Sequence, residues 1–332
     1  MAQMKYFYEL TISSSPHAHS PVTTQTIMRD VLIALVPALL GSIYFFGFRA
    51  LLVTLVSAAA CVFFEWGFCK IRKLHCKTYD LSAVVTGVLL AFVCPVTIPY
   101  WTIILGDFFA IVLVKMLFGG LGKNIVNPAL AGRAFLFSWP VLMSNWVKVG
   151  FDNAAGLLST ADAVTAATPM SAMHQGALPE ESILDMFLGN IGGCIGETSA
   201  LLLIIGFIYL LYRKVITARI PLAYIGTVAI LAFLFPQGND RIVWMAAQVF
   251  GGGLMLGAIF MATDYVTSPL TKLGQIVYGI GCGVITILIR YFGGYSEGVT
   301  YAILCMNACS VLLDKIGRPV KFGAPKKEAA KK

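Results

Sequence analysis

The sequence predicts an all-α polytopic membrane protein of about ten transmembrane helices, built as two inverted five-helix repeats. Of its 332 residues, 58% are hydrophobic and only 12% are charged, whereas a soluble domain carries about 25% charged residues. Ten apolar runs approach or reach the roughly 17–25 residues that span a bilayer core of about 30 Å. A short pattern that recurs five runs later indicates that the second half of the chain repeats the first.

The apolar runs divide the chain into five parts. The runs lie at about 31–48, 50–68, 81–97, 99–117, 127–147, 194–212, 220–236, 243–263, 274–292 and 299–313. The third run continues into CPVTIP and the fifth begins at NPALAGR, so these two are less regular than the others. The predicted parts are an N-terminal segment 1–30, a first repeat 31–147, a loop 148–193, a second repeat 194–313 and a basic tail 314–332.

Two sequence matches support the internal repeat. Residues 87–99 read GVLLAFVCPVTIP and residues 257–269 read GAIFMATDYVTSP, so Gly and Val-Thr-x-Pro recur at the same spacing. The FGG at 118–120 matches the FGG at 292–294, and this offset places Arg133 opposite Asn307. An offset of five helices reverses the direction of crossing, and inverted repeats with broken helices can build a central site. Chance is the alternative, because Gly and Pro are common in membrane helices.

The basic residues are distributed unevenly between the two predicted sides of the membrane. With the tail KKEAAKK in the cytoplasm, the cytoplasmic segments hold nineteen of the 24 Lys and Arg residues and the opposite segments hold four. Cytoplasmic loops normally carry this excess, so both termini are predicted to be cytoplasmic and the loop 148–193 to lie outside. The net charge of +8 therefore does not indicate a nucleic-acid partner.

Arg133 and Glu197 are charged residues close to the ends of predicted spans. A cation in lipid costs at least ~2.5–3.5 kcal/mol, so Arg133 is expected to have a partner. That partner could be a cofactor phosphate or an acidic side chain of a neighbouring subunit, unless the side chain snorkels to the interface. Glu197 in CIGETSALL opens a helix, where a carboxylate often only complements the helix dipole.

Two aspartates are candidates for an ion path. Asp107 in ILGDFFAIVL lies deep in a span and is expected either to bind an ion or to pair with a basic group, while Asp264 in MATDYVTSP precedes a predicted helix break on the inner face. Glu65 and Lys115 lie near cytoplasmic ends and are expected to be interfacial. A structural polar network fits the same residues.

Motifs for hydrolysis or ATP use are absent. The sequence contains no GxSxG, no HExxH and no Walker loop, which argues against a hydrolase or an ATP-driven pump. Neither a catalytic residue nor a metal site is expected. His17 and His19 in SPHAHSP have no further ligand nearby and are taken as polar residues of the N-terminal segment.

Six segments together resemble the RnfD/NqrB family of membrane subunits. They are SSSPHAHSP, FGGLGKNIVNPALAGRAFLF, DAVTAATP, GETSALLLIIG, FMATDYVTSPLTKLG and RPVKFG. Their order along the chain carries the resemblance, which covers nearly the whole sequence. The length, without a long N-terminal extension, looks more like the D subunit of the Rnf complex than the longer B subunit of the sodium-pumping NADH:quinone oxidoreductase.

The resemblance implies a covalent flavin. The family's attachment motif is Asp-x-x-Ser/Thr-Gly/Ala/Ser-Ala-Thr, and this chain matches it at every position with Asp162, Thr165, Ala166, Ala167 and Thr168. By this resemblance Thr168 carries FMN through a phosphoester, attached by a flavin transferase that needs an accessible, flexible loop outside the membrane. An ordinary turn before a proline is the alternative for the motif alone. Arg133 and Glu197 are further candidates for contact with the cofactor.

The resemblance also implies the function. The chain would be an electron-carrying subunit of a ferredoxin:NAD+ oxidoreductase in a prokaryotic inner membrane that moves Na+ or H+. Its partners would be the other membrane and peripheral subunits, including a second FMN-bearing subunit on the outer side, and a non-covalent riboflavin nearer the inner side is possible by the same resemblance. The alternatives are a cofactor-free channel or transporter of inverted-repeat fold, and a scaffold whose charges only hold other subunits.

Overall fold

The computed structural model describes residues 22–73, 78–143, 146, 168–179, 181–238 and 240–317. Over these residues the secondary structure is helical and contains no strand. The first half comprises α2 (Thr24–Phe46), α3 (Phe48–Arg72), η1 (Thr78–Asp80), α4 (Ser82–Phe92), α5 (Tyr100–Phe108), η2 (Phe109–Met116), α6 (Pro128–Leu136) and α7 (Pro140–Met143). The remainder comprises α8 (Pro169–His174), α9 (Ile183–Leu188), α10 (Ala200–Tyr212), α11 (Arg219–Leu234), α12 (Arg241–Phe250), α13 (Leu254–Leu256), η4 (Gly257–Met261), α14 (Lys272–Phe292) and α15 (Val299–Leu313).

Several helices are long and apolar enough to cross a bilayer. Among the described residues these are α2, α3 and α14. The pair formed by α12 with α13–η4 is bent by 59° and is long and apolar enough only when both pieces are counted as one broken span. The predicted runs coincide with helices, but α4, α10, α11 and α15 are shorter apolar helices. The fold is that of a helical membrane protein, and ten crossings in two inverted repeats remain a prediction.

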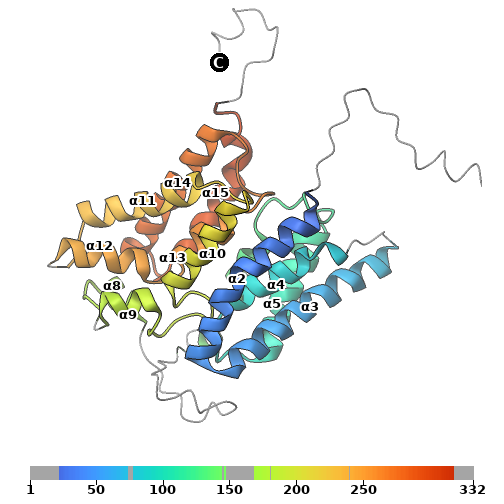
Figure 1. Cartoon of the computed structure of the whole chain (residues 1–332), viewed down its shortest axis with the longest axis horizontal. Coiled ribbons are helices and arrows are strands. Elements are labelled where there is room, and N and C mark those ends of the chain that lie inside the picture. The colour runs from blue at the N-terminus through green and yellow to red at the C-terminus, as the bar shows by residue number, and fades with distance from the viewer. Residues whose placement is uncertain are drawn as a thin grey trace, which may run out of the picture.

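The helices form two groups that lie side by side (Figure 1). In the first group α3 packs on α4 and α5, and in the second α11 packs on α12 and α14. Helices α2 and α10 pack against each other and join the two groups. The beginning of α2 and the end of α15 lie toward the top of Figure 1, whereas α8 and α9 lie toward the bottom.

The chain breaks its helices at two buried places. After α4, the segment around Cys94 and Pro95 is irregular, and the carbonyls of Phe92 and Cys94 accept hydrogen bonds from the backbone N–H groups of Gly196 and Ile195 at 2.9 and 3.0 Å. Arg49 donates to the carbonyl of Val96 at 2.8 Å. Irregular backbone at membrane depth needs such partners. The segment before α10 therefore completes the break after α4.

The second break is a run of three glycines between α12 and α13. Gly252 has φ +67, a left-handed conformation that glycine adopts without the strain imposed by a Cβ. On the C-terminal side of this break lies η4, a π-helix, and η2 in the first group is also a π-helix. Such segments frequently mark functional sites. The two breaks bring the groups of helices together around the residues described next.

Candidate functional site

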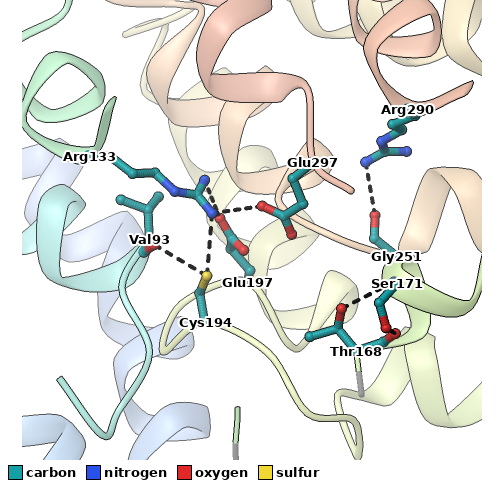
Figure 2. A network of polar contacts seen from close by, with 9 residues as sticks. All are labelled: Val93, Arg133, Thr168, Ser171, Cys194, Glu197, Gly251, Arg290 and Glu297. Atoms are coloured by element: carbon teal, nitrogen blue, oxygen red, sulfur yellow. Dashed lines mark hydrogen bonds and ion pairs between the residues drawn. The ribbon is translucent and has the colours of Figure 1, made fainter. Parts of the chain in front are cut away.

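Thr168 begins helix α8 and is half-buried. Its side-chain hydroxyl accepts a hydrogen bond from the backbone N–H of Ser171 at 3.3 Å, and the Ser171 hydroxyl donates to the Thr168 carbonyl at 2.7 Å (Figure 2). Pro169 occupies the first helical position, for which its fixed φ is suited. The hydroxyl is thus held at the start of a short helix within the predicted loop 148–193. Asp162, Thr165, Ala166 and Ala167 lie outside the described residues.

A small cavity opens beside Thr168. Its wall combines glycine backbone with two carboxylates, and it is lined by Trp146, Thr168, Pro169, Met170, Ile191, Gly192, Gly193, Glu197, Thr198, Gly252 and Glu297. Apart from Trp146, the lining residues come from α8 and its N-cap, from the segment before α10, from the glycine break and from the loop between α14 and α15. Segments far apart in the sequence therefore meet at the Thr168 hydroxyl.

Arg133 on α6 is the centre of a buried ion-pair cluster at this cavity (Figure 2). One guanidinium nitrogen lies 3.1 Å from a Glu197 carboxylate oxygen and another lies 2.7 Å from a Glu297 oxygen. The sequence-based expectation that a cofactor phosphate or a neighbouring subunit would supply the partner is wrong for these contacts, because the chain supplies both acids itself. The side chains of Arg133, Glu197 and Glu297 are only 2%, 3% and 18% exposed.

Glu197 has a different local role from the one predicted. Helix α10 begins at Ala200 with Ser199 as its N-cap, so Glu197 precedes the helix and does not lie in its first turn. The Cys194 thiol lies 3.5 Å from the Arg133 guanidinium and donates to the Val93 carbonyl at 3.2 Å. The segment that carries Glu197 is therefore fixed to the first break on one side and to Arg133 on the other.

The sequence does not mark Glu297 or Arg290 as residues of the site. Glu297 lies in the loop YSEG after α14, a surface-like stretch with no signal of burial. The charge count assigns Arg290 to an extracytoplasmic segment, but its side chain is 1% exposed and donates to the Gln248 carbonyl at 2.6 Å and the Gly251 carbonyl at 3.3 Å. The one signal in the sequence is that no acidic residue lies near Arg133 along the chain, so its partner must come from a distant segment.

Arg290 and Glu297 approach each other across the glycine break. A Cβ at residue 252 would lie 3.1 Å from an Arg290 guanidinium nitrogen and 3.1 Å from a Glu297 oxygen. A Cβ at residue 253 would overlap the Glu197 carboxylate. Glycine is therefore favoured at 252 by its backbone conformation and required at 253 by space. The glycine break lets the two carboxylates and the two guanidiniums pack around the cavity.

Asp107 is completely buried between α3 and α5. Its carboxylate accepts from the Ser57 hydroxyl at 2.7 Å and from the Cys61 thiol at 3.2 Å, while its second oxygen has no hydrogen-bond partner. Pairing with a basic group, one of the two expectations, is not found among the described residues. The role of Asp107 as an ion ligand stays a prediction.

Glu65 and Lys115 are buried rather than interfacial. The Lys115 ammonium lies 3.0 Å from a Glu65 oxygen and donates to the Ser82 hydroxyl at 2.7 Å. The Glu65 side chain is only 7% exposed and the Lys115 side chain only 2%. The expectation that both are interfacial is therefore wrong. The cause is the packing of α3 against η2, which covers both ends of the pair.

Asp264 lines a second cavity near the beginning of α2. Its carboxylate accepts from the Thr267 hydroxyl at 3.0 Å, and burial raises the pKa of this carboxyl. The polar residues of the cavity wall are Ser82, Thr86, Lys115, Asn124, Asn127, Thr263, Asp264 and Tyr265. Asn127 caps α6 and donates to the Met261 carbonyl at the end of η4. The two cavities therefore lie toward opposite ends of the molecule, because α2 begins at the end remote from α8 (Figure 1).

Comparison with known proteins identifies relatives over nearly the full length. The family model described as NQR2, RnfD, RnfE matches residues 11–323. The chain is 46% identical over 323 residues to the D subunit of the Na(+)-translocating ferredoxin:NAD(+) oxidoreductase complex of Acetobacterium woodii, covering 96% of each chain. It is 44% identical over 330 residues to the D subunit of the proton-translocating complex of Clostridium ljungdahlii, covering 94% of this chain and 96% of the relative. The D subunit of an ion-translocating oxidoreductase complex of Halorhodospira halophila is 36% identical over 338 residues, which cover 93% of this chain and 94% of the relative.

Proposed function

Because this chain belongs to the NQR2, RnfD, RnfE family, we propose that it is the membrane-embedded D subunit of an ion-translocating ferredoxin:NAD+ oxidoreductase complex. The relatives named above are D subunits, which favours this assignment over the B subunit of a sodium-pumping NADH:quinone oxidoreductase. Their names also disfavour a cofactor-free channel or a scaffold. Since relatives of 46% and 44% identity are named for Na+ and for protons respectively, overall identity does not determine the coupling ion.

The observation that supports an electron-carrying role is the Thr168 hydroxyl at the cavity. It is the last position of the complete match to the attachment motif, it is only half-buried, and the glycines at 192, 193 and 252 leave backbone open beside it. These features fit a covalent FMN on the Thr168 oxygen. When bound, the flavin supplies one- and two-electron transfer, and the protein supplies its position and electrostatic surroundings.

In this proposal the residues around the cavity orient and shield the cofactor. Ser171 fixes the Thr168 hydroxyl, and the Arg133 cluster holds the surrounding segments in place. Electrons would be exchanged with a second FMN-bearing subunit on the outer side of the prokaryotic inner membrane, and a flavin transferase would attach the cofactor during maturation. Other membrane and peripheral subunits would complete the complex.

The Thr168 assignment is tested by flavin fluorescence of the denatured protein on a gel. Cells that express the flavin transferase should give a fluorescent band with the wild-type chain. We expect Thr168→Ala to abolish this band, because it removes the only oxygen that forms the ester, while Thr165→Ala keeps it. A dark wild-type band, or a band that survives in Thr168→Ala, would contradict the assignment.

We also propose ten crossings in two inverted halves, with both termini cytoplasmic. The same kinds of packing occur in each group: α3 with α4 and α5 in the first, and α11 with α12 and α14 in the second. The ends of the described chain lie opposite α8, as cytoplasmic termini and an external Thr168 require (Figure 1). The repeat in the sequence pairs the end of α4 with η4, which follows the bend after α12.

The second cavity is our candidate site for a non-covalent riboflavin. Its wall offers hydroxyl, amide and ammonium groups from Thr86, Asn124, Asn127 and Lys115, which could hydrogen-bond a polar ring. It lies away from Thr168, so the two flavins would occupy separate ends of the molecule. Flavin released on denaturation of Thr168→Ala protein measures the occupancy of this second site.

A further inference from the structure

Glu197 and Glu297 share one guanidinium at the wall of the Thr168 cavity. Arg133 contacts both, at 3.1 and 2.7 Å, so the three groups together carry one excess negative charge when both acids are ionised. Arg290 offsets this charge from the side of Glu297, because both side chains come within 3.1 Å of the point that a Cβ on residue 252 would occupy. The two acids are therefore compensated unequally.

Glu197 is the less compensated of the two carboxylates. Its ion-pair contact with Arg133 is the longer of the two, and its side chain is 3% exposed against 18% for Glu297. Burial and a neighbouring carboxylate both disfavour the ionised form of an acid, unless a cation nearby balances its charge. The charged and titratable groups that face it are Arg133 of α6, Arg290 of α14, Glu297 of the following loop and Cys194 of its own segment. Farther out, His174 of α8 contacts the Arg290 carbonyl and Tyr301 of α15 lies near Arg133.

Negative charge that enters this cavity will act first on Glu197. Both Glu197 and Thr168 line the cavity, so a group on the Thr168 oxygen shares its wall with the carboxylate. An added electron there disfavours the ionised form of the nearest poorly compensated acid. Glu297, held by Arg133 at 2.7 Å and near Arg290, resists the same change.

We propose that the Glu197 carboxylate is a redox-linked proton-binding site, which takes up one proton when an electron reaches the flavin on Thr168. The step balances as one electron to the flavin and one proton from water to a Glu197 oxygen, where it forms an O–H bond. Reoxidation releases both. The electron comes from the electron-donating partner subunit in the complex, or from an electrode in the test. This inference rests on the proposed attachment of FMN to Thr168.

Infrared difference spectroscopy of the purified complex tests the proposal. The flavin is reduced and reoxidised at an electrode, and the subunit carries glutamate labelled with ¹³C at the side-chain carboxyl. We expect reduction to produce the C=O band of a protonated carboxyl group, and the label to shift that band. Because flavin carbonyls carry no label, the shift identifies a glutamate even without a variant.

Variants then identify which glutamate gains the proton. Glu197→Gln should lose the band, and Glu181→Gln, which removes the same charge outside the cavity lining, should keep it. In Glu297→Gln, Arg133 has Glu197 as its one remaining acidic partner. Glu197 should then stay ionised more readily, so the band should weaken. A fluorescent, reducible wild-type preparation without a label-sensitive band would overturn the inference, as would a band that persists in Glu197→Gln. A dark wild-type gel band would instead show that the proposed function itself had failed.

Discussion

At the scale of single residues, Arg133 stabilises the protein by neutralising the carboxylates that it contacts. Its guanidinium contacts one fully buried carboxylate, Glu197, and one partly buried carboxylate, Glu297. Replacing a buried ion pair as a whole can be neutral, but removing one partner leaves uncompensated charge. Whether a substitution in this cluster lowers the stability therefore depends on which charged side chain it leaves without a partner.

We expect Arg133→Met to destabilise the protein by about 3–5 kcal/mol, because the buried Glu197 then loses its ion-pair partner and the remaining cation, Arg290, lies on the side of Glu297. Arg241→Met, at an exposed position at the start of α12, should change stability by less than about 0.5 kcal/mol. The measurement is the midpoint of denaturation in detergent. Adding Glu197→Gln to Arg133→Met should recover part of the loss, and an unchanged midpoint for Arg133→Met would contradict the role of the cluster.

The two aspartates can be separated from the redox chemistry by conservative substitution. Asp107→Asn and Asp264→Asn remove a charge while keeping most of the side-chain shape, and neither residue lines the Thr168 cavity. If either lies on the ion path, its variant should keep the fluorescent gel band and lose ion-coupled electron transfer. Ion uptake by reconstituted complexes is the measurement, and unchanged uptake in both variants would leave the aspartates with structural roles.

Sequence reasoning located some of these residues without predicting their contacts. Arg133 stands out because a cation inside an apolar run is costly, and this argument required a partner. It could not find Glu297, since the contact joins residues 164 positions apart. The same limitation concealed the Glu65–Lys115 pair, whose members looked interfacial from their place along the helices. Burial of a charge depends on which helices cover it, and local sequence does not record that.

At the scale of helices, glycines set how closely neighbours approach. Gly279 on α14 faces α11, and a Cβ there would lie 2.7 Å from the Ala223 Cβ and 2.9 Å from the Ile220 carbonyl oxygen. Small residues commonly allow such contact between membrane helices. Gly226 on α11 has no atom within 4 Å of the corresponding position. Substitution by alanine should therefore have opposite effects on stability at these two glycines.

Gly279→Ala should destabilise the protein by about 1–3 kcal/mol, because α11 and α14 must move apart to admit the methyl group. Gly226→Ala should be neutral or stabilising by up to about 1 kcal/mol, since alanine has the higher helix propensity. Denaturation midpoints of the two variants are to be compared under the same conditions. Equal effects would show that the packing of α14 on α11 is looser than described.

The positions of the helices were more predictable than their ends. The third run was expected to extend to residue 97, but α4 ends at Phe92 because Pro95 and Pro99 follow it. The fifth was expected from 127 to 147, and α6 does begin after Asn127 but ends at Leu136. Apolar composition continues through both irregular segments, so hydropathy alone could not detect where helical hydrogen bonding stops.

At the scale of the whole molecule, the predicted topology separates α9 from the loop before α14. Leu184 on α9 is 71% exposed and Leu270 before α14 is 81% exposed. With the native accessible thiols replaced, a thiol reagent that cannot cross membranes should label Leu184→Cys from the outside of intact spheroplasts. It should label Leu270→Cys only after the membrane is opened. The reverse pattern would invert the proposed orientation.

The Arg133 cluster also has a consequence for synthesis of the chain. Arg133 precedes Glu197 by 64 residues and Glu297 by 164 residues. At roughly 5–20 residues per second, ribosomes need about 8–33 s to reach Glu297 after Arg133 has been made. Until Glu197 has been made, the nascent chain holds Arg133 without either acid, and until Glu297 has been made it lacks the second acid. The ion pairs are therefore completed only when the last helix is made. A truncated chain that lacks Glu297 carries an incompletely paired Arg133, which distinguishes it from a finished chain during membrane quality control.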